Sequence, residues 1–105
     1  MNISLDYDDT YTRDPVLWNV FIQDCLVRGH TVYVVTMRTP EQGQEVLESA
    51  GQRVGESRCY FTSMQSKRNY MYARGISIDV WIDDMPDAIL HGIDNEVNDG
   101  KIYLP

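Results

Sequence analysis

The sequence predicts an α/β domain with a mostly parallel central sheet. Segments rich in β-branched and aromatic residues alternate along the 105-residue chain with segments whose apolar residues recur at helical spacing. The run at residues 31–36 is almost continuously apolar, as expected for a strand buried on both faces. Repeats, low-complexity stretches and long linkers are absent, so we expect one domain over residues 1–105.

Local signals place the elements in order. Asp14 and Pro15 form an N-cap and a first helical residue, and Gly29 ends that helix. Thr39 and Gln42 have the spacing of a capping box for the next helix. The expected strands are at residues 2–8, 31–36, 58–62 and 77–82, and the expected helices are at 15–28, 40–50, 66–74 and 86–91. A turn at 99–100 and a short final strand or hairpin arm at 101–104 complete the prediction.

Polar side chains that suit phosphoryl chemistry follow each expected strand. They are Asp6 and Asp8 after the first, Thr36 at the end of the second, Lys67 after the third, and Asp83, Asp84 and Asp87 after the fourth. The carboxyl ends of parallel strands meet at one edge of a sheet, where ligands bind. Clustered carboxylates are unfavourable unless a divalent cation or a phosphate-handling role compensates them. We therefore expect one site that combines a nucleophile, a proton carrier, a metal and phosphoryl donors.

These residues resemble, in order and spacing, the four motifs of the haloacid dehalogenase-like (HAD) superfamily. The first motif is similar to the segment from Leu5 to Thr10, the second ends at Thr36, the third is Lys67, and the fourth runs from Trp81 to Asp87. The resemblance covers nearly the whole chain and implies a three-layer Rossmannoid fold. It also implies a phosphatase, because dehalogenases of the superfamily lack the second carboxylate of the first motif.

The resemblance assigns a role to each matching residue. Asp6 is expected to attack phosphorus and form an aspartyl-phosphate, and Asp8 to protonate the leaving oxygen and then deprotonate water. Thr36 and Lys67 are expected to bind phosphoryl oxygens. Arg38 resembles the arginine that follows the second motif in several phosphatases of the superfamily, where it contacts substrate phosphate; a solvated loop arginine is the alternative.

The cofactor implied by the resemblance is Mg²⁺. Its ligands would be the Asp6 side chain, the Asp8 backbone carbonyl and Asp83. The outer ligand would be either Asp84 or Asp87, because the spacing of each from Asp83 resembles a pattern found in the superfamily.

The chain leaves no room for a cap domain. Only residues 11–14 separate the first motif from the first helix, and one helix and one strand fill residues 37–66. The expected function is a capless Mg²⁺-dependent phosphomonoester hydrolase acting on a phosphorylated metabolite or nucleotide, with a homo-oligomer completing the pocket. The alternative is a non-catalytic protein that sequesters a phospho-ligand or nucleotide on the same fold.

Composition limits the classes of partner and the cellular location that we expect for this chain. A formal net charge of −7 argues against nucleic acid, whose phosphates are neutralised by clustered Lys and Arg. Cys25 and Cys59 form no metal-binding pair and are expected to be reduced core residues. No apolar run has the length of about 20 residues that crosses a bilayer. The expected location is the cytoplasm, or the host cytoplasm if the chain is phage-encoded, since its compactness resembles small hydrolases of bacteria and their phages.

Overall fold

A parallel sheet forms the centre of the computed structural model, which describes residues 1–94. Its strands are β1 (Asn2–Leu5), β2 (Thr31–Thr36), β3 (Cys59–Phe61) and β4 (Val80–Ile82). They lie in the order β3-β2-β1-β4, and each neighbouring pair is parallel. The predicted α/β class and parallel sheet are thereby confirmed for the described residues. The predicted turn and strand at 99–104 lie outside them.

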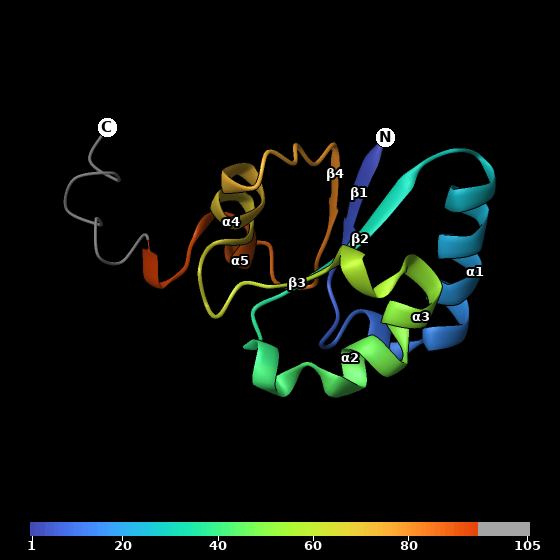
Figure 1. Cartoon of the computed structure of the whole chain (residues 1–105), viewed down its shortest axis with the longest axis horizontal. Coiled ribbons are helices and arrows are strands. Elements are labelled where there is room, and N and C mark those ends of the chain that lie inside the picture. Colours follow the sequence, from blue (N-terminus) through green and yellow to red (C-terminus); the bar gives the residue numbers. More distant parts are fainter. Residues whose placement is uncertain (95–105) are drawn as a thin grey trace.

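Helices cover both faces of this sheet (Figure 1). On one side lie α1 (Pro15–Val27), α2 (Gln44–Glu48) and α3 (Ala50–Val54), and on the other lie α4 (Lys67–Ala73) and α5 (Asp87–Leu90). Single 3-10 turns lie between strands and helices, at Tyr11–Arg13, Pro40–Gln42 and Glu56–Arg58. The arrangement is compatible with a Rossmann-like fold.

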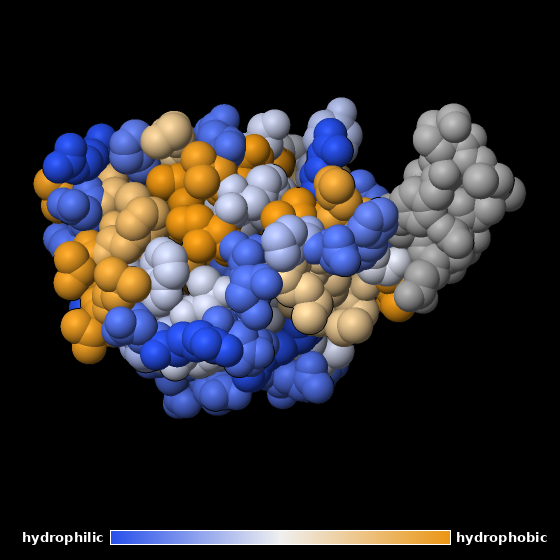
Figure 2. Space-filling model, turned by 180° about the vertical axis from the view of Figure 1, so that it is seen from behind, coloured by the Kyte–Doolittle hydropathy of each residue, from blue (hydrophilic) through white to orange (hydrophobic). Residues whose placement is uncertain are grey.

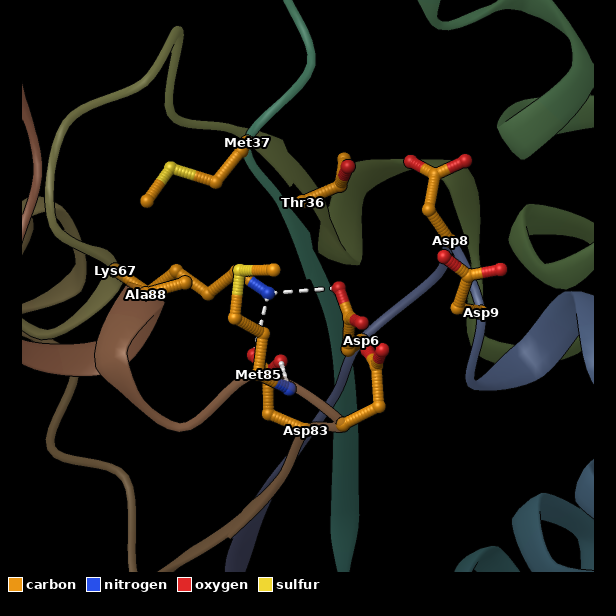
Figure 3. A pocket seen from close by; sticks show the side chains of 10 residues that line it. Asp6, Asp8, Asp9, Thr36, Met37, Lys67, Asp83, Met85 and Ala88 are labelled. Carbon is orange, nitrogen blue, oxygen red and sulfur yellow. Dashed lines mark hydrogen bonds and ion pairs between the residues drawn. The ribbon is translucent and has the colours of Figure 1, made fainter.

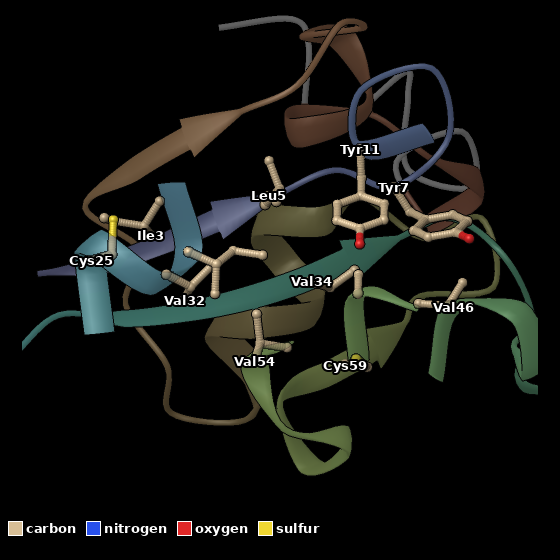
Figure 4. Close-up of a cluster of buried hydrophobic side chains, with 12 residues drawn as sticks. Ile3, Leu5, Tyr7, Tyr11, Cys25, Val32, Val34, Val46, Val54 and Cys59 are labelled. Carbon is tan, nitrogen blue, oxygen red and sulfur yellow. The ribbon is translucent and has the colours of Figure 1, made fainter. Parts of the chain in front are cut away.

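The core lies between the sheet and the layer that contains α1 and α3 (Figure 4). Leu5, Val32 and Val34 from the two central strands are fully buried. Ile22 of α1 and Val54 of α3 pack against them. Burying one such side chain contributes roughly 1.5–3 kcal/mol, so this cluster fixes the strands whose ends carry the candidate site.

Three predicted strands are too long: the third, predicted at 58–62, is Cys59–Phe61, and the first and fourth differ more. The first ends at Leu5 instead of residue 8, because the chain turns immediately after it: the amide of Thr10 donates to the carbonyl of Tyr7 at 3.4 Å, and Asp9 has a φ of 61°. The fourth begins at Val80 instead of residue 77. The preceding segment instead bonds to Asn2, whose carbonyl accepts from the amide of Asp79 at 2.8 Å.

The predicted helix at residues 40–50 is wrong as a single element. The capping-box contact forms, with Gln42 Oε1 accepting from the amide of Thr39 at 3.0 Å, but it caps only a 3-10 turn. α2 then breaks at Ser49, whose hydroxyl donates to the carbonyl of Glu45 at 2.6 Å. Serine competes with the helical backbone in this way. Gly51 lies inside α3 rather than ending a helix, and the chain leaves α3 at Gly55, which has a φ of 99°.

The outer face of α1 is unusually apolar for a surface helix. Val16, Leu17, Val20 and Val27 are all exposed, and apolar surface is visible at the edge of the molecule where α1 lies (Figure 2). No helix within residues 1–94 has the length and apolar character of a membrane span.

Candidate functional site

Three adjacent strands bring the predicted site residues to one edge of the sheet. Leu5 pairs with Val34 on one side and with Ile82 on the other, so the residues that follow β1 and β4 start side by side. The amide of Asp6 donates to the carbonyl of Ile82 at 3.0 Å. The resulting pocket of about 150 Å³ is lined by Asp6, Asp8, Asp9, Thr36, Met37, Lys67, Asp83, Asp84, Met85 and Ala88 (Figure 3).

Lys67 links the strands through its buried ammonium group. Its Nζ donates to Asp6 Oδ1 at 2.7 Å and also to Asp83 Oδ2, while the side chain is only 2% exposed. A buried ammonium group is tolerated only when opposite charges and hydrogen bonds compensate its lost hydration. Lys67 therefore holds the two carboxylates together and places a positive charge in the pocket.

The segment after α5 fixes the approach to Lys67. Asp94 Oδ1 accepts from the amide of Ser66 at 2.8 Å, and the amide of Ile93 donates to the carbonyl of Met64 at 2.9 Å. A Cβ on Gly92 would lie 2.4 Å from backbone atoms of Met64 and Ser66, so only glycine permits this approach. The start of α4 is thus held in place from outside the predicted motifs.

Asp6 occupies the centre of the carboxylate group. Burial raises its pKa to about 6, although the nearby Lys67 ammonium opposes the shift. Its second oxygen, Oδ2, accepts from the Thr10 hydroxyl at 3.1 Å. Asp6 is therefore a buried carboxylate whose two oxygens both have donors, and it is ionised above about pH 6.

Asp6, Asp83 and Asp84 form a group that fits a small hard cation. One oxygen from each lies within 4.8 Å of the others. Hydrogen bonds with Asp6 and then with Thr10 lower the pKa of Asp84, which favours its charged form. A set made only of carboxylate oxygens is the chemistry that Mg²⁺ prefers. Asp87 is exposed at the first position of α5 and lies outside this group, so the structure places Asp84, and not Asp87, beside Asp6.

Asp8 faces a different partner from the other carboxylates. Arg38 Nη2 donates to Asp8 Oδ1 at 2.7 Å and Arg38 Nε donates to Asp8 Oδ2 at 3.0 Å. These hydrogen bonds lower the pKa of Asp8. In Figure 3 the Asp8 carboxylate points away from Lys67. The predicted proton carrier is thus ionised and bound to an arginine.

Thr36 lies at the end of β2 and is 1% exposed. Its hydroxyl oxygen accepts from the amide of Arg38 at 3.3 Å, which leaves the hydroxyl proton for another acceptor. Thr36 lines the same pocket as Lys67. These two side chains are therefore placed to donate to one bound anion.

Several contacts were absent from the sequence prediction. Glu45 accepts from Arg38 Nη1, Tyr7 places its ring 5.1 Å from the Arg38 guanidinium carbon, and Met37 and Met85 line the pocket. None of these follows from a motif. Tyr7, Met37 and Met85 lie next to or near predicted site residues in the sequence, which was their only signal, whereas Glu45 had none.

Comparison with models of known protein families, with curated proteins and with solved structures finds no match to this chain. Its class is therefore defined by fold and site alone. It is an α/β domain with a parallel sheet, and at one edge of that sheet a buried lysine is bridged to two carboxylates.

Proposed function

We propose that this chain is a Mg²⁺-dependent phosphomonoester hydrolase of the HAD-like type without a cap, acting through an aspartyl-phosphate on Asp6. The observation that carries the proposal is the Lys67 ammonium, which is buried between Asp6 and Asp83. It lies at the edge of the sheet where β2 ends with Thr36, which lines the same pocket. A carboxylate beside a fixed cation and a hydroxyl donor is the set that nucleophilic phosphoryl transfer needs. The predicted substrate is a small phosphorylated metabolite or nucleotide. We expect a second copy of the chain to bind the exposed apolar face of α1.

In the proposed reaction, one oxygen of Asp6 attacks phosphorus and the bond to the leaving oxygen breaks. Asp8, once protonated, gives its proton to that oxygen. It then takes a proton from the water that cleaves the aspartyl-phosphate, which releases inorganic phosphate and restores Asp6. Lys67 and Thr36 donate to the phosphoryl oxygens throughout, which stabilises the charge of the transition state.

Asp6, Asp83 and Asp84 would hold the metal ion, with the backbone carbonyl of Asp8 as a further ligand. Bound Mg²⁺ supplies positive charge that stabilises the transferring phosphoryl group. Lys67 lessens the repulsion among the carboxylates at the same place.

The proposal is tested by phosphate release from a generic aryl phosphate and from a panel of metabolites and nucleotides, with Mg²⁺ and with chelator. We expect turnover that requires Mg²⁺ and that Asp6→Asn abolishes. Asp9→Asn is the matched control, because Asp9 lines the same pocket and is exposed. Equal turnover by Asp6→Asn and wild type would contradict the proposal.

A second function is favoured by one observation, the two-point contact between Asp8 and Arg38. While Arg38 holds both oxygens of Asp8, Asp8 is not placed to carry a proton, as expected if the chain sequesters a phospho-ligand without hydrolysing it. Binding of nucleotides or metabolite phosphates with no phosphate release across the panel would support this alternative.

A further inference from the structure

One edge of the Arg38 guanidinium is hydrogen-bonded to a carboxylate of the protein itself, that of Asp8. Nε and Nη2 donate to the two oxygens of Asp8, at 3.0 and 2.7 Å. This is the paired geometry with which a guanidinium binds a carboxylate or a phosphate of a ligand. Arg38 therefore presents an anion-binding edge that is already formed.

The remaining part of the guanidinium is fixed without Asp8. Its Nη1 donates to the backbone carbonyl of Gln42 at 2.8 Å and to the carboxylate of Glu45, and the ring of Tyr7 lies 5.1 Å from the guanidinium carbon. The Arg38 side chain is 20% exposed. Because these contacts do not involve Asp8, they orient Arg38 independently of it, and such preorganisation lowers the entropic cost of binding an anion.

Arg38 borders the catalytic pocket without lining it. Lys67 and Thr36 line the pocket, whose volume of about 150 Å³ suits one phosphoryl group, and Asp8 lines it from the side of Arg38. The Asp8 side chain is 51% exposed and has room to move. An anion in the place of its carboxylate would lie beside the phosphoryl group, as a second group of the same substrate.

We propose that Arg38 determines specificity for substrates that carry a second anionic group, a carboxylate or a phosphate, next to the phosphoryl group that is transferred. The inference rests on the proposed function and narrows its substrate class. Binding of the second anion replaces one negative partner of Arg38 with another, so the charge at the guanidinium is preserved. The same exchange releases Asp8 toward the pocket, where the proposed reaction needs it.

The test uses three phosphonates that the chain cannot hydrolyse, measured by isothermal titration calorimetry with Mg²⁺ in excess. Methylphosphonate carries one anionic group, phosphonoacetate adds a carboxylate, and methylenebisphosphonate adds a second phosphonate. We expect wild type to bind at least one of the latter two about 10-fold or more tightly than methylphosphonate, as charged hydrogen bonds allow. The tighter of the two identifies the second anion.

Arg38→Gln should reduce this preference to within about 2-fold while the affinity for methylphosphonate stays near that of wild type. Arg13→Gln is the matched control, because it removes an exposed arginine near Asp9 and Asp84 that has no contact with Asp8 among the described contacts. It should keep the preference.

Equal affinities for all three probes in wild type would overturn the inference. So would an equal loss of affinity for all three in Arg38→Gln, since Arg38 would then bind the transferred phosphoryl group itself. The phosphonates separate this inference from the proposed function, because their binding does not depend on turnover. Hydrolysis without the preference would refute the inference alone, and no binding of any probe together with no hydrolysis would refute both.

Discussion

Replacing Lys67 with methionine is the perturbation whose effect follows most directly from the site. The substitution keeps the length of the side chain and removes the charge that Asp6 and Asp83 share in a site where Lys67 is 2% exposed. Breaking a buried ion pair by removing one partner costs about 3–5 kcal/mol, because a charge is left buried without compensation. Two carboxylates lose their partner here, so we expect Lys67→Met to lower the free energy of unfolding by at least about 3 kcal/mol near neutral pH.

The pH dependence of this loss has a definite sign. The pKa of Asp6 is already raised from 3.8 to about 6, and removal of Lys67 raises it further. A group with a raised pKa in the folded state contributes stability below its unfolded pKa and loses that contribution as pH rises through the folded value. The deficit of Lys67→Met relative to wild type should therefore shrink as pH falls from about 7.5 toward 4 and Asp6 takes up a proton.

Urea denaturation followed by tryptophan fluorescence, in the presence of chelator and at several pH values, measures this deficit. Arg68→Met is the matched control, because Arg68 is the exposed next residue of α4. Added Mg²⁺ should stabilise Lys67→Met more than wild type, since it supplies the missing positive charge. A deficit that equals that of Arg68→Met, or that does not change with pH, would refute the reasoning.

Three further results are expected. Asp84→Asn should weaken Mg²⁺ binding in calorimetry by about 10-fold or more and Asp87→Asn by less than about 2-fold, because only Asp84 lies with the other two carboxylates; the reverse ranking would assign the outer position to Asp87. Gly92→Ala should lower stability in urea denaturation by about 2 kcal/mol, because the added Cβ would lie 2.4 Å from backbone atoms of the loop before α4; an unchanged midpoint would show that the loop yields. Burial raises the pKa of the Cys59 thiol to about 11, so its reaction with a disulfide reagent near pH 8 should be slow in the native state and fast in urea; rapid native labelling would contradict this burial.

Much of the fold was predictable because its signals are local. Asp14 caps α1 as expected, with its Oδ1 accepting from the amide of Leu17 at 3.1 Å, and Gly29 leaves the helix with a φ of 86°. β2 has its predicted bounds, Thr31–Thr36, since an uninterrupted β-branched run suits a strand buried on both faces. Such features depend only on residues that are neighbours in the sequence, so they can be predicted from it.

Contacts between distant residues account for what was not predictable. The break at Ser49 depends on a hydroxyl that also lies 3.0 Å from the Tyr7 hydroxyl, 42 residues away. The contact between Arg38 and Asp8 spans 30 residues and changes the state expected of the proton carrier. The residue types of the site were visible at strand ends, whereas the partner of each side chain depends on how the loops after the strands pack.

The aspartyl-phosphate on Asp6 is the central claim, and its capture is the most direct test. The enzyme would be quenched with acid during turnover of its best substrate and treated with borohydride, which reduces an acyl phosphate to an alcohol. Mass spectrometry of the peptide that ends at Arg13 would then locate the product. The proposed mechanism predicts homoserine at position 6 in wild type and not in enzyme quenched without substrate. Turnover with no reduced residue, or with reduction at a different carboxylate, would contradict it.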